Sequence, residues 1–483
     1  MPRFRKLLCS LIPIVSVSCS TAPSQAPNTT LPIQLDSRAT SSVPDQWWRL
    51  YQDPNLNTAV EQALAHNRNL SEAAAHLLAA RQVANAVEGE KLPSTSLHTE
   101  GGYGSTAQDQ LEAALDQSDT IRTGTRYGIG MDVQWEVDLF GRLKSLSKAS
   151  HANVLAVMAE EQGMRVEVAA ETTRAWLNAC DAAQQSVLAQ RALTLAEEKQ
   201  HVVQMLSQAG VGSTLDQVQA QARVDQTSTA LPPLHAARQR ALAELAVLMG
   251  RLPDDPPAAA QQCATAPAIA SIHIPHETGA ALLQRRPDVL RAQQQLNAAT
   301  AKIGVSTAEL YPRISLGGAI YSSAHQPKGW GDSGATVWSL GPLISWSFPN
   351  ISITRAHIAE AGANQQAALA HFDATLLQAL KEVQENLADY QAAQQAQSSL
   401  QDAAAQSQQA LHLAQIAQKE GASSALDYLT AQQATLAAQR QLANENGELI
   451  NAQVTLFKSL GGGWQQAPDI ALPDLSLLSK TGN

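Results

Sequence analysis

The alternation of apolar and polar residues along the chain changes character within one short segment, 127–142 (YGIGMDVQWEVDLFGR). From Tyr127 to Val137 every second residue is apolar and those between are Gly, Asp, Gln or Glu, which predicts a β-strand with one apolar and one polar face. From Arg142 the chain is rich in Ala, Gln, Glu and Leu, with no proline before Pro232, which predicts a very long helix. A strand that leads directly into such a helix is the organising feature of the sequence.

The pattern occurs twice along the chain. An early helical segment that stops at Pro93 returns 219 residues later and stops at Pro312. A second set of matched residues lies 211 residues apart: Trp135 and Trp346, Gly210 and Gly421, Ser213 and Ser424, Leu215 and Leu426, Asp216 and Asp427, Gly250 and Gly461. The constant spacing predicts two copies of one helical unit. The difference between the two spacings predicts a longer loop in the first copy, around 105–122.

Each copy is expected to contain a short helix, two strands, a long outgoing helix, a glycine turn and a long return helix. The expected elements of the first repeat, 53–250, are strands at 94–104 and 123–138 and helices at 143–208 and 214–249. Those of the second repeat, 277–461, are strands at 314–321 and 336–348 and helices at 352–419 and 425–459. The outgoing helices would be about 100 Å long at 1.5 Å per residue. Their apolar residues recur at steps of three and four, which predicts packing against neighbouring helices. Pro232 and Pro233 predict a break in the first return helix.

The N-terminus has the features of an export signal. Basic residues precede an apolar run, Leu7 to Val17, that is too short to span a membrane, so 1–18 is interpreted as a signal peptide. Cys19 and the Ser, Thr and Pro tract after it resemble a bacterial lipoprotein signal, which implies a lipid on Cys19 and an anchored tail, 19–52. Ser16 stands where a large aliphatic residue is usual, so a plain secretory signal cleaved nearby is the alternative.

Three further interpretations concern the tail, the linkers and the cysteines. Trp47, Trp48 and Tyr51 are expected to pin the tail to the body of the protein. Segments 251–276 and 462–483 are interpreted as a linker and a C-terminal tail in an equatorial region. Cys180 and Cys263 have no metal-binding spacing and are interpreted as buried small hydrophobes rather than a disulfide or a site.

Composition excludes several classes of function. The net charge of −10 and the pI near 5.6 provide no basic surface for nucleic acid. The glycines at 461–463 lack the Lys and Ser or Thr of a phosphate-binding loop, and the twelve histidines are scattered without the spacing of a metal or catalytic site. The sequence therefore predicts no enzyme, no metal site and no cofactor.

The four expected strands cannot form a closed barrel within one chain. An open sheet in lipid would leave unpaired backbone groups at its edges. Three copies would supply twelve strands, an acceptable size for an outer-membrane barrel. The predicted fold class is an α+β membrane protein. Four strands per chain complete a trimeric 12-stranded barrel, long coiled-coil helices continue it as a periplasmic α-barrel, and a small equatorial mixed region surrounds the helices.

Five segments carry a resemblance to a known family: WEVDLFGR (135–142), QRRPDV (284–289), AGVGSTLD (209–216), EGASSALD (420–427) and LGGGW (460–464). Together they resemble the TolC-like outer-membrane factors, most closely the NodT-type efflux lipoproteins, from Trp47 to the C-terminus. The resemblance implies a homotrimeric channel-tunnel in the bacterial outer membrane that extends into the periplasm. A periplasmic adaptor and an inner-membrane pump of the resistance-nodulation-division (RND) type would be its partners, besides outer-membrane lipid. The pump would supply the energy and select the substrate.

Two other functions remain open at this point. A duct for type I protein secretion uses the same fold, although the lipoprotein signal and the QRRPDV segment favour efflux. A non-conducting, lipid-anchored periplasmic coiled coil would be a different class of protein. The apolar strand 336–348 argues against it, because a coiled coil has no use for a membrane strand.

The resemblance also implies roles for particular residues. It assigns the two glycine turns, with Gly210, Ser213, Gly421 and Ser424, to the periplasmic tip, where the family closes its pore. Asp427 matches an acidic gate position, Asp216 is its repeat partner, and Thr430 replaces a second Asp that some relatives carry. The alternative is that both aspartates stabilise the first turn of a helix.

The junction between barrel and tunnel is assigned to four residues: Trp135, Phe140, Gly141 and Trp346. Because residues 347–351 differ from residues 136–140, two inequivalent junctions per chain are predicted.

Overall fold

The computed structural model describes residues 26–27, 44–267, 285–346, 350–467 and 470. The chain forms two compact units. The strand unit consists mainly of Ala80–Val154 and Gln294–Ala370, and the helical unit contains the described parts of Thr30–Ala79, Leu155–Gln293 and His371–Asn483. Each unit takes segments from both sequence repeats, so the compact units are not the repeats themselves.

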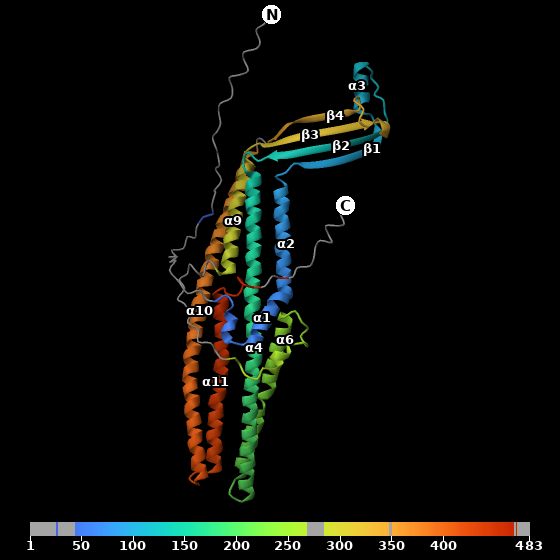
Figure 1. Ribbon diagram of the computed structural model, residues 1–483. Coiled ribbons are helices and arrows are strands. Elements are labelled where there is room, and N and C mark those ends of the chain that lie inside the picture. Colours follow the sequence, from blue (N-terminus) through green and yellow to red (C-terminus); the bar gives the residue numbers. More distant parts are fainter. Residues whose placement is uncertain (1–25, 28–43, 268–284, 347–349, 468–469, 471–483) are drawn as a thin grey trace. The chain divides into compact units, whose positions relative to one another are not determined.

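A four-stranded antiparallel sheet dominates the strand unit (Figure 1). Its members are β1 (Ser94–Gly104), β2 (Gly124–Val137), β3 (Arg313–Ala324) and β4 (Thr336–Ser345). The strand order is β1-β2-β3-β4, so the central pair joins strands from different repeats. β4 ends at Ser345, and residues 347 and 348 of the expected fourth strand lie outside the described residues.

The segment between β1 and β2 contains a helix where the sequence pattern predicts a loop. This helix, α3, spans Ala107–Leu115. Thr106 accepts a hydrogen bond from the Asp109 N–H at 3.2 Å, while the Asp109 carboxylate accepts one from the Thr106 N–H at 2.7 Å. This reciprocal capping box is the local signal that the loop assignment overlooked.

Two helices, each about 100 Å long, are the longest described elements of the chain. They are α4 (Arg142–Gln208), with 67 residues, and α10 (Ile351–Lys419), with 69. The other described helices are η1 (Trp47–Tyr51), α1 (Pro54–His66), α2 (Arg68–Gly89), α5 (Thr214–Ser228), α6 (Leu231–Leu248), α7 (Ala258–Gln262), α9 (Pro287–Ala308), η2 (Pro327–Gly329) and α11 (Ala425–Ser459). Among the described residues, no helix has the length and hydropathy needed to cross a membrane.

The two return segments differ as the prolines predict. In the first repeat the helix stops at Ser228 and restarts at Leu231, with Pro232 and Pro233 in the first turn of α6. Proline at this position is tolerated because its missing N–H would have no intrahelical partner there. In the second repeat α11 continues without a break for 35 residues.

The core of the helical unit forms around the aromatic residues of η1. Trp47, Trp48 and Tyr51 are buried, and the Trp47 ring stacks on Phe457 of α11 with ring centroids 4.9 Å apart. The Tyr51 hydroxyl donates to Gln453 at 2.9 Å. The prediction that these aromatics pin the tail to the body is confirmed.

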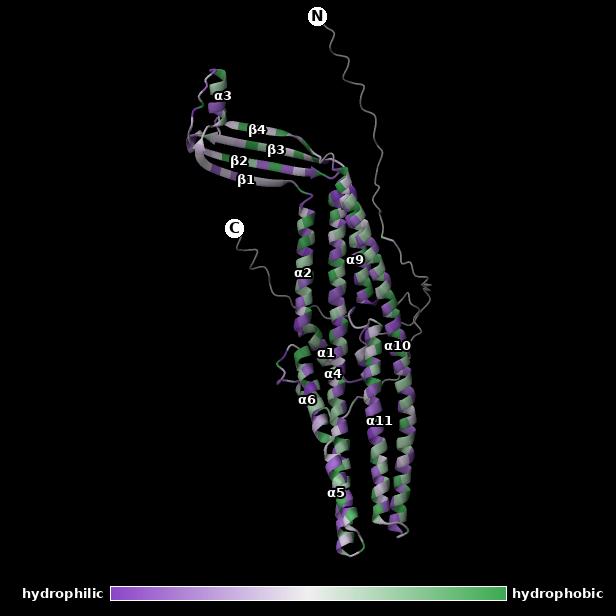
Figure 2. Cartoon of the chain, turned by 180° about the vertical axis from the view of Figure 1, so that it is seen from behind, coloured by the Kyte–Doolittle hydropathy of each residue, from purple (hydrophilic) through white to green (hydrophobic). Residues whose placement is uncertain are grey.

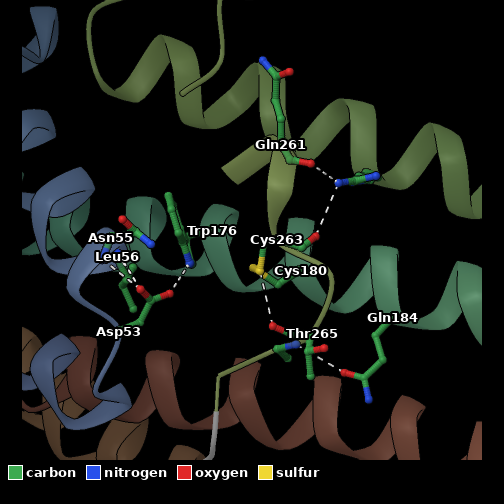
Figure 3. Close-up of a disulfide and its surroundings, with 11 residues drawn as sticks. Asp53, Asn55, Leu56, Trp176, Cys180, Gln184, Gln261, Cys263 and Thr265 are labelled. Carbon is green, nitrogen blue, oxygen red and sulfur yellow. Dashed lines mark hydrogen bonds between the residues drawn. A yellow bond between two sulfur atoms is a disulfide. The ribbon is translucent and has the colours of Figure 1, made fainter. Parts of the chain in front are cut away.

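A disulfide joins Cys180 of α4 to Cys263, which follows α7 (Figure 3). The interpretation of these cysteines as free buried residues is therefore wrong, although Cys180 is fully buried. Sequence spacing carried no signal for the pair, because 83 residues separate the two cysteines and only folding brings them together. Arg238 of α6 donates to the carbonyls of Gln261 and Cys263 and holds the same segment in place.

Candidate functional site

The sheet has one apolar and one polar face. Met131 of β2 pairs with Leu97 of β1 and with Ile320 of β3, so these side chains share a face. The same face carries Tyr103, Tyr127, Ile129, Val133, Trp135, Leu316, Trp338, Leu340 and Ile344. Trp338 is 74% exposed and Leu340 71%. An apolar surface of this extent needs a nonaqueous cover.

The opposite face of the sheet is polar. Its members include His98, Glu100, Arg126, Asp132, Gln134, Glu136, Ser315, Tyr321 and Ser339. Hydrophilic and hydrophobic residues alternate along the strands in Figure 2. A sheet of this kind separates lipid from water, so the apolar face can lie against the membrane while the polar face lines an aqueous lumen.

Side-chain hydrogen bonds, one stacked pair of aromatic rings and one glycine with positive φ hold the junction between β2 and α4. The Trp135 indole Nε1 donates to the Lys91 carbonyl at 2.9 Å, and the Phe140 ring stacks on Tyr311 with centroids 4.5 Å apart. Gly141 adopts φ +73°, a conformation that favours glycine. The Asp138 carboxylate then accepts the N–H groups of Leu143 and Lys144 at 3.1 and 2.8 Å and thereby starts the helix.

The second junction is only partly described. Trp346 follows β4 and is 51% exposed, and α10 begins at Ile351 without an acidic residue in its first turn. Residues 347–349 lie outside the described part of the chain. The predicted inequivalence of the two junctions therefore stays a prediction.

The two glycine turns have the same geometry. Gly210 and Gly421 have φ +74° and +73°, and each ends a long helix. The N–H groups of Val211 and Ala422 donate back to the Leu206 and Ala417 carbonyls at 2.9 and 2.8 Å. Both turns lie at the same end of the helical unit in Figure 1. Glycine is suited to these positions, because other residues strain in this conformation.

A capping box follows each turn. The Asp216 carboxylate accepts from the Ser213 N–H at 3.0 Å and from its hydroxyl at 2.7 Å, and Asp427 accepts from Ser424 at the same two distances. These hydrogen bonds hold the pKa of both carboxyl groups below the usual value. The two aspartates therefore stabilise helix starts and are negatively charged at neutral pH.

Thr430 lies one turn beyond Asp427 on the same helix. Its hydroxyl donates to the Leu426 carbonyl at 2.7 Å and accepts from Lys199 of α4 at 3.3 Å. Thr430 therefore links α11 to α4 and adds no second carboxylate at the turn. Cys19, the predicted lipidation site, lies outside the described residues.

Arg286 holds the N-terminus of α9, which begins at the next residue. This buried side chain donates to the Ser459 carbonyl at 2.9 Å, to Asp288 at 2.7 Å and to Glu382 at 2.8 Å. Arg286 thereby ties the start of α9 to α10 and α11. Within the described part of the chain, no group of three or more His, Cys, Asp or Glu residues could hold a metal ion.

The sequence matches the family model described as "Outer membrane efflux protein" over residues 59–251 and 279–462. The chain belongs to the outer membrane efflux protein family. This outer membrane efflux protein is similar to the solvent efflux pump outer membrane protein SrpC of Pseudomonas putida, with 30% identity over 96% of this chain and 98% of SrpC. It is also similar to the outer membrane protein OprJ of Pseudomonas aeruginosa, with 28% identity over 88% of each chain.

The solved structure of the outer-membrane channel OprN has the same fold as this outer membrane efflux protein. The TM-score is 0.80 at 33% identity, covering 92% of this chain and 100% of that one. The predicted family and fold class are thereby confirmed. The protein is an outer-membrane channel component of an efflux pump that extends into the periplasm.

One group of residues in this efflux protein escaped the sequence reasoning. His98, Glu100, Arg126, Asp132 and Tyr321 come together on the polar face of the sheet. They belong to three strands, one of them from the second repeat. Only the register of β1, β2 and β3 reveals their proximity, and no spacing in the sequence signals it.

Proposed function

We propose that the twelve-stranded barrel, which three copies of the chain close together, serves as a passive exit duct. The observation that carries this proposal is the amphipathic sheet, whose edge strands in the described structure are β1 and β4. A sheet edge cannot stay open in lipid, because its backbone groups would lack hydrogen-bond partners. Pairing β1 of one copy with β4 of the next satisfies both edges, and three copies supply an even strand number typical of outer-membrane barrels.

The partners follow from the same assembly. The long helices would form a periplasmic tube that receives substrate from an adaptor protein and an inner-membrane pump of the RND type, while outer-membrane lipid covers the apolar face of the sheet. The duct hydrolyses nothing, and the pump supplies the energy. Relatives of similar identity are named for solvent, toluene and cation efflux. This range supports substrate selection by the pump rather than by the duct.

The glycine turns would form the periplasmic gate. Each turn carries one exposed aspartate, Asp216 or Asp427, and threefold symmetry would arrange each of them as a ring. Like charges in a ring repel one another and attract cations, so the rings can bias both opening and ion passage. In this proposal the capping and gating roles belong to the same side chains.

The lipid anchor is a separate proposal. Cys19 would become the acylated N-terminus of the mature protein and hold the tail at the membrane. Mass spectrometry of the mature N-terminus tests it. We expect an acylated Cys19, and an unmodified N-terminus at any other residue would refute the anchor.

Conductance in planar bilayers tests the duct. We expect a purified trimer that opens ion channels, with larger or more frequent openings after Asp427→Ala. A protein that conducts under no condition, including with this substitution, would refute the duct and favour a non-conducting coiled coil. Antibiotic or solvent sensitivity of a deletion strain separates efflux from type I protein secretion, since loss of an exported protein without loss of efflux would support secretion.

A further inference from the structure

Five side chains form a connected cluster on the polar face of the sheet, here called the lumen cluster: His98, Glu100, Arg126, Asp132 and Tyr321. His98 Nδ1 lies 3.2 Å from the Asp132 carboxylate, and its ring stacks on Tyr321 with centroids 6.0 Å apart. The Tyr321 hydroxyl donates to Glu100, which also pairs with Arg126 at 3.3 Å. The cluster therefore joins β1, β2 and β3.

Two glycines of β2 make room for the cluster. A Cβ at Gly130 would lie 2.4 Å from His98 Nε2, and a Cβ at Gly128 would lie 2.5 Å from the Tyr321 hydroxyl oxygen. Side chains from the flanking strands β1 and β3 thus lie flat across β2 on the polar face of the sheet. Because no larger residue fits at these two positions without moving His98 or Tyr321, the flat arrangement depends on both glycines.

The net charge of the lumen cluster differs by one between the neutral and the protonated form of the His98 imidazole. The charged and titratable side chains around His98 are Asp132 and Arg126 on β2, Glu100 on its own strand and Tyr321 on β3. Two carboxylates and one guanidinium leave one negative charge when the imidazole is neutral and none when it is protonated. Histidine is the side chain whose charge ordinarily changes between pH 5 and 8.

We propose that the lumen cluster is a pH-sensitive, ion-selective band in the barrel wall, with inorganic cations as its preferred ions at alkaline pH. The inference rests on the proposed function, which makes the polar face a lumen and repeats the cluster three times around it. The partial exposure of His98 and Asp132, with 48% and 50% of their side-chain surface accessible, leaves both groups in contact with passing ions. Charge in such a ring acts over a Debye length of about 10 Å in 0.1 M salt.

The experiment measures reversal potentials of the full-length trimer in planar bilayers under a KCl gradient. The pH is changed from 8 to 5 in both chambers, and Asp216 and Asp427 keep their charge over this range because hydrogen bonds hold their pKa below the usual value. We expect the K⁺ over Cl⁻ permeability ratio of the wild type to fall by about threefold, which corresponds to the loss of one charge per copy near the ion path.

Three variants separate the lumen cluster from other groups. H98Q keeps the negative charge at both pH values, so its permeability ratio should stay high. D132N should lack the cation preference at pH 8 and become anion-selective at pH 5. H76Q is the matched control, because His76 forms an exposed pair with Glu72 on α2, at 3.7 Å, and should behave as wild type.

The outcomes distinguish the inference from the function on which it rests. A trimer that conducts no ions contradicts both the duct and the selective band. A conducting trimer whose pH response is unchanged by H98Q and D132N contradicts the band alone. A response that H76Q removes would assign the effect to α2 and would also overturn the inference.

Discussion

Loss of the Cys180–Cys263 disulfide should destabilise the protein by an amount that the chain length between the cysteines determines. The bond closes a loop of 83 residues in the unfolded chain. The loop-closure relation yields about 4.5 kcal/mol for that length, if the folded state is otherwise unchanged. With an unfolding entropy of about 2.1 cal/mol/K per residue, and 483 residues in the chain, the thermal midpoint should fall by about 4 to 5 °C.

The assay is thermal unfolding of the purified protein followed by circular dichroism. Cys180→Ala suits the buried site on α4, and Cys263→Ser suits the half-buried site after α7. Each single variant and the double variant should lose the same stability, because each removes the same cross-link. Reduction of the wild type should reproduce the shift and should leave the double variant unchanged. Equal midpoints for the wild type and the double variant, or additive losses from the two single variants, would refute the reasoning.

Three further predictions concern groups elsewhere in the fold. Burial, opposed by a hydrogen bond from Gln185 and reinforced by the charge of Glu448, raises the pKa of Asp181 to about 6. The stability that protonation of Asp181 contributes is present below its ordinary pKa and is lost as pH rises through 6. Asp181→Asn removes this titration and should stabilise the protein at pH 8 by at most about 3 kcal/mol. At pH 3, where the carboxyl group is neutral in both the folded and the unfolded state, the substitution should not stabilise the protein. Gly250→Ala should lower the midpoint of unfolding, because its φ is +73° and a Cβ would lie 2.4 Å from a backbone carbonyl oxygen. Asp427→Asn should increase channel opening if the carboxylate charge gates the pore.

Each of these predictions has a matched control. Unfolding midpoints of Asp181→Asn must be compared across pH, since a pH-independent shift would assign its effect to packing. Gly362→Ala lies in α10 with open space around the new Cβ and should stabilise by about 0.5 to 1 kcal/mol, whereas equal effects at Gly250 and Gly362 would contradict the role of φ. Asp216→Asn alters the same capping geometry in the first repeat, and unchanged conductance in both aspartate variants would leave only the capping role.

Local sequence patterns correctly predicted the elements whose formation depends on residues close together along the chain. Alternation over 127–137 indicated β2, and the proline pair at 232 and 233 indicated the break before α6. The Ser-x-x-Asp motifs after Gly210 and Gly421 indicated helix starts, since a capping box needs only residues three apart. The same motif type, Thr106 to Asp109, would have indicated α3.

The sequence by itself determined the amphipathic strands, the long helices, the duplicated plan and the family, because periodicity and short motifs are properties of adjacent residues. The tertiary structure alone decided that β2 pairs with β3 across the two repeats, that Cys180 meets Cys263, and that His98 stacks on Tyr321. Each of these contacts joins residues far apart along the chain. Strand register and chain closure set such contacts, and both depend on the packing of the whole fold rather than on any local pattern.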